Sequence, residues 1–218
     1  MVRRTKEEAE QTRNAILDAA EALFFEQGVA RTTLEGIARA AGVTRGAVYW
    51  HFHDKVDLFE AMQARAKLPQ EDVFHGLLDR ADASSLEALC ATLKEVLQLM
   101  VTDQRRRRVF TILFHRCEYV EEMRGIIERK QARTDEFMER ATRFFEAAAA
   151  RGDLAPHWLP AAAALSMHAL LIGLLSRMLQ AGAPDERAVA LAQECVTAFF
   201  RSLAISGDPA PGAGGAPT

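Results

Sequence analysis

The sequence predicts an all-α protein, and two observations carry that prediction. Ala, Leu, Glu and Arg are frequent, whereas Gly and Pro are few outside the last dozen positions of the 218-residue chain. Apolar residues recur at helical spacing, and no segment shows the apolar–polar alternation of a half-buried strand. We therefore expect about nine helices, in a small domain over residues 1–55 and a larger one over residues 56–205. Residues 206–218, mostly Gly, Pro and Ala, are expected to form a disordered tail.

The first two helices of the small domain follow from their apolar stripes and their end signals. A first helix is predicted over residues 6–27, with Gly28 as its stop. Thr32, with Glu35 three residues later, fits a capping box and predicts the start of a second helix. Gly42 lies where that helix must end, because glycine adopts the left-handed turn conformation without steric cost.

A third helix follows at once, with Thr44 as its cap. Ala47 and Val48 give it a modest core face, and Asp54 caps a fourth helix that continues toward Pro69. Two short helices joined by a glycine turn, over about residues 32–52, predict a helix-turn-helix, whose second helix enters the major groove of DNA.

The helices of the larger domain are predicted in the same way. Ser84 with Glu87 suggests another capping box, Gly152 ends a long helix, and Pro156 and Pro160 open the next. The predicted helices run over about residues 84–102, 104–117, 120–151, 160–180 and 186–203.

The residue types on the third helix suit a DNA groove. Arg45 can donate two parallel hydrogen bonds to a guanine, and Thr44 at the helix start can take a phosphate oxygen. Gly46 carries no side chain, so the backbone can approach the duplex closely. The alternative is a corner of a helical protein with Tyr49 and Trp50 as core aromatics, but such large side chains overfill the core face of so short a helix. The predicted DNA-binding residues are Thr33, Thr44, Arg45, Gly46, Tyr49, Trp50, His51 and Lys55.

Charge is concentrated in the same region. The formal net charge of the whole chain is −3, which argues against a surface coated for indiscriminate nucleic-acid binding. Between residues 28 and 55, however, Arg31, Arg39, Arg45 and Lys55 face only Glu35 and Asp54. The sequence therefore predicts binding through one small surface.

Three stretches carry a resemblance to a known family: Arg3-Arg4-Thr5-Lys6-Glu7-Glu8, the run from Gly42 to Phe52, and Asp54-Lys55. Together they are similar to the DNA-binding domain of TetR-type transcriptional regulators. The start, the Tyr-Trp-His-Phe ending and the stretch from Asp103 to Glu118 resemble the subgroup of local repressors of multidrug efflux operons. The resemblance implies a homodimer, with one or two dimers on a palindromic operator, released from DNA by a small hydrophobic effector. It also implies a four-helix dimer interface, made by residues 161–180 and 186–203 and their copies.

The same resemblance places an apolar effector pocket in the larger domain. Three of the residues matched to that pocket, Phe110, Phe114 and Ile172, stand where related pockets often have polar side chains, which favours flat aromatic or lipophilic effectors. The residues matched to the pocket lining are Val96, Phe110, Phe114, Phe137, His168, Ile172 and Leu175. For most of these positions the alternative is an ordinary bundle core, and His168 is either a polar anchor for the effector or a satisfied core histidine.

Other functions are weighed against the regulator. An enzyme with a helical pocket is disfavoured because the chain has no Gly-x-Ser-x-Gly, phosphate loop or His-Glu-x-x-His motif, and an architectural DNA-binding protein would not need so large a second domain. A TetR-type regulator that answers to an acyl chain or a metabolite stays open.

We expect no cofactor and no metal, since His115 and Cys117, two positions apart, do not share a helix face. Arg105–Arg108 is interpreted as ion pairs at the domain junction rather than a second nucleic-acid patch.

The compartment is expected to be the cytoplasm. The N-terminus lacks the apolar core of a signal peptide, and three unevenly spaced cysteines indicate reduced thiols rather than a redox switch. The most apolar stretch, Leu159 to Leu175, is at the lower limit for a membrane span, and its small residues suit a buried helix.

Overall fold

The computed structural model describes residues 6–65, 75–81, 84–117, 124–180 and 184–204. Its helices are α1 (Lys6–Gln27), α2 (Leu34–Ala40), α3 (Arg45–His51), α4 (Lys55–Arg65), α6 (Leu86–Thr102), α7 (Gln104–Thr111), the π-helix η2 (Ile112–Arg116), α8 (Arg124–Arg151), α9 (Pro160–Gln180) and α10 (Glu186–Leu203). No strand is assigned within these described ranges, which confirms the all-α prediction. The expected tail, the path toward Pro69 and the first residues of the helix expected from residue 120 lie outside the described residues.

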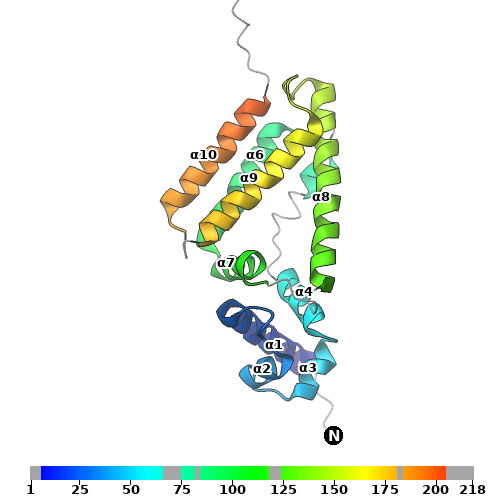
Figure 1. Ribbon diagram of the computed structural model, residues 1–218, viewed down its shortest axis with the longest axis vertical. Coiled ribbons are helices and arrows are strands. Elements are labelled where there is room, and N and C mark those ends of the chain that lie inside the picture. Colours follow the sequence, from blue (N-terminus) through cyan, green and yellow to red (C-terminus); the bar gives the residue numbers. More distant parts are fainter. Residues whose placement is uncertain (1–5, 66–74, 82–83, 118–123, 181–183, 205–218) are drawn as a thin grey trace, which may run out of the picture.

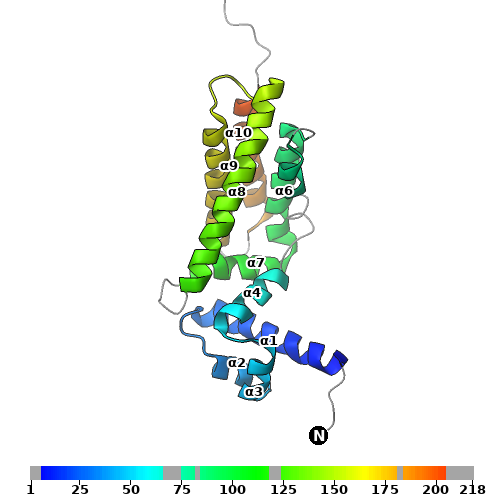
Figure 2. The ribbon, with the colours of Figure 1, turned by 90° about the vertical axis from the view of Figure 1, so that its right-hand side faces the viewer.

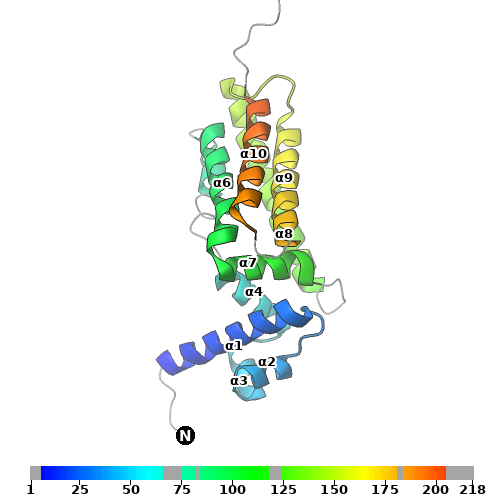
Figure 3. The ribbon, with the colours of Figure 1, turned by 90° about the vertical axis from the view of Figure 1, so that its left-hand side faces the viewer.

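The helices form two layers along the long axis of the molecule. α6, α8, α9 and α10 run roughly along this axis, and α7 lies across the end of their bundle (Figure 1, Figure 2). α1 crosses the axis below α7, and α2 and α3 lie at the far end from the bundle (Figure 3). The helix-turn-helix is therefore presented at one tip of the molecule.

The N-terminal core is built by α1 to α4 and closed by α7 and η2. Ile16, Leu17 and Phe24 of α1 are fully buried, and the Phe24 ring meets that of Phe59 edge-on at 5.8 Å. The same cluster includes Val109 of α7 and Ile112 of η2, which come from the larger part of the chain. The small domain is therefore packed directly against an element of the large one.

Two predicted caps lie one residue later than expected. Thr33, not Thr32, caps α2: its hydroxyl accepts from the Gly36 amide at 3.0 Å. Ser85, not Ser84, caps α6. Thr32 is fully buried, and its hydroxyl donates to the carbonyl of Gly28. In each pair of adjacent hydroxyl residues the first side chain turns into the protein, so only the second can reach the helix amides.

The predicted helix over residues 104–117 differs from the structure in its second half. After α7 the backbone widens into the π-helix η2, which ends at Arg116. The carbonyl of Arg116 accepts a hydrogen bond from the Val29 amide at 2.9 Å, just after α1. The π geometry thus places the end of this segment on the small domain, and single π turns are frequent at functional sites.

α9 packs between α8 and α10 and contributes six buried residues, including Met167 and Leu175. By length and composition it could also cross a membrane, with a mean hydropathy of 1.6 over its most apolar window. A core helix of a helical bundle meets the same criterion, and the neighbours of α9 in the structure are helices on both sides (Figure 1).

Candidate functional site

α3 is an almost entirely outward-facing helix. Within it only Val48 is buried, and Phe52, which follows the helix, anchors its end in the core. Tyr49 is 47 % exposed and Trp50 is 72 % exposed. A core corner would bury these aromatic rings, because each can remove a large apolar area from water. The two rings are instead available to a partner.

The turn and the caps around α3 agree with the sequence prediction. Gly42 has a φ of 68°, the left-handed conformation that ends α2. The Thr44 hydroxyl accepts from the Ala47 amide at 3.2 Å, so α3 begins as predicted. A Cβ added at Gly46 would meet only the Thr44 hydroxyl, at 3.9 Å. The protein itself therefore does not require glycine at this position, whereas a close external surface would.

Arg45 and Tyr49 form a pair one turn apart on α3. The Nη2 of Arg45 donates a hydrogen bond to the Tyr49 hydroxyl at 3.2 Å, and the guanidinium carbon lies 5.4 Å from the centre of the Tyr49 ring. The hydrogen bond to Tyr49 raises the pKa of Arg45. The pair holds a planar group of fixed positive charge on the exposed face of the helix.

Trp50 and His51 lie at the end of α3. Their rings meet edge-on at 4.5 Å, and the His51 side chain is half-buried between Trp50 and Phe52. The guanidinium of Arg13 lies 5.3 Å above the Phe52 ring, which ties α1 to this end of the helix. Trp50 therefore projects from a helix end that is held by packing contacts.

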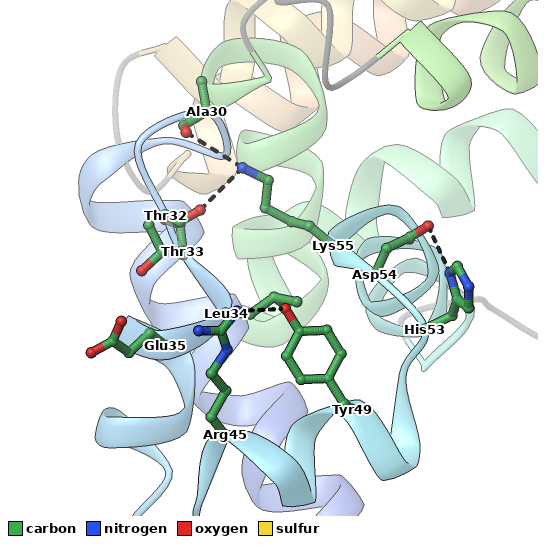
Figure 4. A pocket seen from close by; sticks show the side chains of 10 residues that line it. All are labelled: Ala30, Thr32, Thr33, Leu34, Glu35, Arg45, Tyr49, His53, Asp54 and Lys55. Atoms are coloured by element: carbon green, nitrogen blue, oxygen red, sulfur yellow. Dashed lines mark hydrogen bonds and ion pairs between the residues drawn. The ribbon is translucent and has the colours of Figure 1, made fainter.

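A groove of about 390 Å³ lies between the start of α2, α3 and the start of α4 (Figure 4). The Arg45 and Tyr49 side chains form one side of it, and Asp54 and His53, joined by a 3.2 Å contact, lie at another (Figure 4). The Asp54 side chain caps α4 by accepting from the Asp57 amide at 2.8 Å, and this bond lowers the pKa of Asp54. The residues lining the groove are Ala30, Thr32, Thr33, Leu34, Glu35, Arg45, Tyr49, His53, Asp54 and Lys55.

Lys55 is placed differently from the sequence prediction. Its side chain is not a solvent-facing phosphate contact: the residue is 6 % exposed, and its Nζ donates to the carbonyls of Ala30 at 3.4 Å and Thr32 at 3.1 Å. The first turn of α4 packs against the segment before α2, so the lysine stem runs inward (Figure 4). Sequence position alone indicated the start of a helix but not which way the side chain turns.

The residues matched to the effector pocket are brought together in two aromatic pairs. The rings of Phe110 and Phe114 stack at 6.2 Å, and those of Phe137 and His168 lie 5.3 Å apart. Phe110, Phe114 and Phe137 pack on the core cluster that contains Leu175. Val96 and Leu175 are buried, and Ile172 is half-buried. Burial lowers the pKa of His168, so its ring stays neutral at neutral pH.

An ion cluster joins the small domain to the large one, and the sequence reasoning missed its acidic half. Glu21 of α1 is almost fully buried, with a side chain 4 % exposed. Its carboxylate forms ion pairs with Arg65 of α4 at 3.5 Å and with Arg105 and Arg108 of α7 at 3.3 and 3.2 Å. The carboxylate of Asp18 forms ion pairs with Arg65 at 2.6 Å and with Arg105. The arginine run therefore makes ion pairs at the junction, as expected. An acid within the apolar stripe of α1 is the signal that could have revealed Glu21.

The outer faces of α9 and α10 carry exposed apolar and small side chains. Leu165 of α9 is 59 % exposed and Leu191 of α10 is 68 % exposed. Exposed alanines at helical spacing extend both stripes, namely Ala162 and Ala169 on α9 and Ala190 and Ala198 on α10. Leu171, Leu174 and Phe199 of the same two helices are partly buried against the core of their own chain.

Comparison with known families follows the same division of the chain. Residues 16–62 match the family described as "Bacterial regulatory proteins, tetR family". Residues 84–199 match "MAATS-type transcriptional repressor, C-terminal region". The repressor BepR of Brucella suis biovar 1 (strain 1330) is 41 % identical over 178 residues, which are 82 % of this chain and 85 % of BepR.

Two solved structures agree with this match. NalD of Pseudomonas aeruginosa, the secondary repressor of the MexAB-OprM multidrug efflux pump, superposes with a TM-score of 0.80 at 41 % identity, covering 92 % of this chain and all of NalD. SmeT, the repressor of the Stenotrophomonas maltophilia multidrug efflux pump SmeDEF, is solved in complex with triclosan. That complex has a TM-score of 0.70 at 33 % identity, over 95 % of this chain and 98 % of SmeT.

Proposed function

Since this chain belongs to the TetR family of bacterial transcriptional regulators, we propose that it represses transcription by binding a palindromic operator as a dimer. The observation that carries the proposal is α3, a helix held on one buried residue with Arg45, Tyr49 and Trp50 on its free face. A helix presented in this way fits the major groove.

The proposed contacts divide into base reading and phosphate binding. Arg45 reads a guanine, because its planar fork matches the two acceptors on that base, and Tyr49 supports it. Gly46 lets the backbone approach. Trp50 and His51 meet the flanking DNA backbone. Thr33, which lines the groove, and Thr44 contact phosphates from the starts of α2 and α3.

We propose that the effector is an apolar, aromatic compound held in the larger part of the chain. The stacked pair Phe110–Phe114 and the pair Phe137–His168 offer ring faces and one neutral imidazole. Val96, Ile172 and Leu175 complete the proposed set. The triclosan complex of SmeT supports an effector of this kind. Regulation of a multidrug efflux operon, in the cytoplasm, is proposed because NalD and SmeT are repressors of such pumps.

Two features distinguish this proposal from its alternatives. An acyl-chain effector would need a long apolar channel, whereas the proposed site offers paired aromatic rings. An aromatic effector should therefore bind more tightly than a fatty acid of similar size. The relatives are transcriptional regulators, and we propose no enzymatic activity.

The test is binding to DNA from upstream of the gene itself and of its neighbours. We expect protection of a palindrome whose half-sites lie about one helical turn apart, and release by triclosan or other hydrophobic antimicrobials. Arg45→Ala should lose the preference for one base position in each half-site. An intact sequence preference in Arg45→Ala would contradict the assignment of α3 as the reading helix.

A further inference from the structure

Lys55 occupies an unusual place for a residue beside a DNA-binding surface. It is the first residue of α4, yet its ammonium is buried under the turn between α1 and α2. Its ammonium donates to the carbonyls of Ala30 at 3.4 Å and Thr32 at 3.1 Å, in the segment that leads into Thr33, the cap of α2 (Figure 4).

A buried ammonium is costly unless its N–H groups are satisfied, so this arrangement is held by specific hydrogen bonds. The turn has a network of its own. The Thr32 hydroxyl donates to the Gly28 carbonyl at 2.8 Å and accepts from the Gln27 side chain at 3.3 Å, and the Thr32 amide donates to the Val29 carbonyl. The Lys55 ammonium adds a charged group to this hydrogen-bond network, and it links the turn to α4.

We propose that Lys55 is a positioning residue: its ammonium fixes the backbone before α2, and through it the hydroxyl of Thr33 and the register of α2 against α3. The inference rests on the proposed operator binding and replaces the direct DNA contact predicted for Lys55 from the sequence. α4 is also the helix that leads toward the large domain and carries Arg65 of the junction cluster. The Lys55 bonds therefore join α4 directly to the DNA-binding surface.

Positioning and phosphate binding predict different salt dependence. A cation that neutralises one phosphate contributes about −0.9 to the slope of log K against log salt concentration, so its loss makes the slope shallower by that amount. A cation that positions other groups leaves the slope unchanged and lowers affinity equally at every salt concentration.

The experiment compares three full-length variants on the operator over a range of salt concentrations. Lys55→Met keeps the apolar stem and removes the ammonium. Lys55→Gln keeps N–H donors for the two carbonyls without a charge. Lys130→Met, an exposed residue of α8, controls for the loss of one positive charge. Hydrogen exchange at the Gly36 and Ile37 amides, which bond Thr33, reports the start of α2 in the free protein.

We expect Lys55→Met to weaken binding about tenfold or more with the wild-type slope, and to speed exchange at Gly36 and Ile37. Lys55→Gln should recover a large part of the affinity. A slope shallower by about 0.9 with unchanged exchange, Lys55→Gln as weak as Lys55→Met, or unchanged affinity in Lys55→Met would each overturn the proposal. If Lys55→Met does not fold, the slope and affinity of Lys55→Gln decide between the two roles.

Failure of the proposed function gives a different result. In that case the wild-type protein binds no palindrome at any salt concentration, whereas the exchange at Gly36 and Ile37 still responds to Lys55→Met.

Discussion

At the scale of single residues, the proposed base reading depends on the pair formed by Arg45 and Tyr49. An exposed arginine loses rotamer freedom when it binds a base, and the stack on Tyr49 removes part of that loss beforehand. We expect Arg45→Ala to reduce discrimination at one base position about ten- to hundredfold. Tyr49→Phe keeps the stack and should retain most of the discrimination, while Tyr49→Ala should lose more of it. A double-mutant cycle in which the Arg45 and Tyr49 effects simply add would contradict the coupling.

Gly46 gives a second prediction at this scale. Gly46→Ala should stabilise the free protein by about 0.5–1 kcal/mol, because alanine favours the helix and its Cβ has room. The same methyl group should weaken operator binding if the backbone lies against the duplex. Thermal unfolding and a binding titration on one preparation measure both. A variant that is more stable and binds with full affinity would show that DNA does not approach this residue.

We expect His168 to make the proposed effector site sensitive to pH. Burial lowers its pKa below the ordinary value, so its neutral form is favoured in the folded protein and the stability it contributes is lost as pH falls through the lowered pKa. Affinity for an uncharged aromatic effector should be constant from about pH 8 to pH 7 and fall at lower pH, as a charge enters the site. His168→Leu should remove that fall. A pH profile of effector binding that is identical in the two proteins would exclude His168 from the site.

What the sequence could predict at this scale follows from how local the signal is. Thr44, Gly42 and the exposed face of α3 depend on neighbours within one turn, and they are where the sequence placed them. The shift of the cap from Thr32 to Thr33 depends on a hydrogen bond from the Thr32 hydroxyl to the Gly28 carbonyl in the preceding turn. The inward turn of Lys55 depends on carbonyls more than twenty positions away along the chain. Such contacts leave no periodic trace in the sequence.

At the scale of elements, α7 and η2 connect the proposed effector site to the DNA-binding surface. One face of the segment carries the Phe110–Phe114 stack, while Val109 and Ile112 are buried in the small domain. The His115 ring contacts the Ser176 carbonyl of α9 at 3.2 Å, and the Arg116 carbonyl accepts from Val29. A shift of this segment therefore moves groups on both sides. Helix bounds were predictable from caps and periodicity, but the π-helix was not, because its cause is this set of tertiary contacts.

The junction cluster should determine how strongly the two sites are coupled. Glu21→Gln removes the carboxylate that three arginines share, and we expect it to cost about 1–3 kcal/mol of stability because those guanidiniums lose their buried partner. It should also reduce the effect of an effector on operator affinity. Glu26→Gln, an exposed position on the same helix, is the control. If a folded Glu21→Gln protein kept the full effect of the effector on operator affinity, that effect would be transmitted through η2 and not through the junction cluster.

At the scale of the whole molecule, the proposed binding to a palindromic operator requires two copies of the chain in a fixed relation. The exposed stripe on α9 and α10 is the surface we expect the copies to share. Ala198→Arg and Leu191→Arg should lower both dimerisation and operator affinity by about tenfold or more, since each places a charge on an apolar contact. Ala192, on the same helix α10, is buried within its own chain, so Ala192→Arg would disrupt the fold instead. Sedimentation and operator titration of each variant measure the two effects, and a monomer with full operator affinity would contradict the account.

The reciprocity of effector and operator binding tests the proposed repressor function most directly. An effector that releases the protein from DNA must bind the free protein more tightly than the operator complex, by the same factor by which it weakens operator affinity. Calorimetry with triclosan, titrated into the free protein and into the protein–operator complex, measures that factor. We expect the affinity of triclosan for the free protein to be well above its affinity for the operator complex, by a ratio equal to that of the operator affinities without and with triclosan. Phe114→Asp and Ile172→Asp should reduce this ratio. Equal affinity of triclosan for the free and the operator-bound protein, with other hydrophobic antimicrobials behaving alike, would contradict the proposed release from DNA by such effectors.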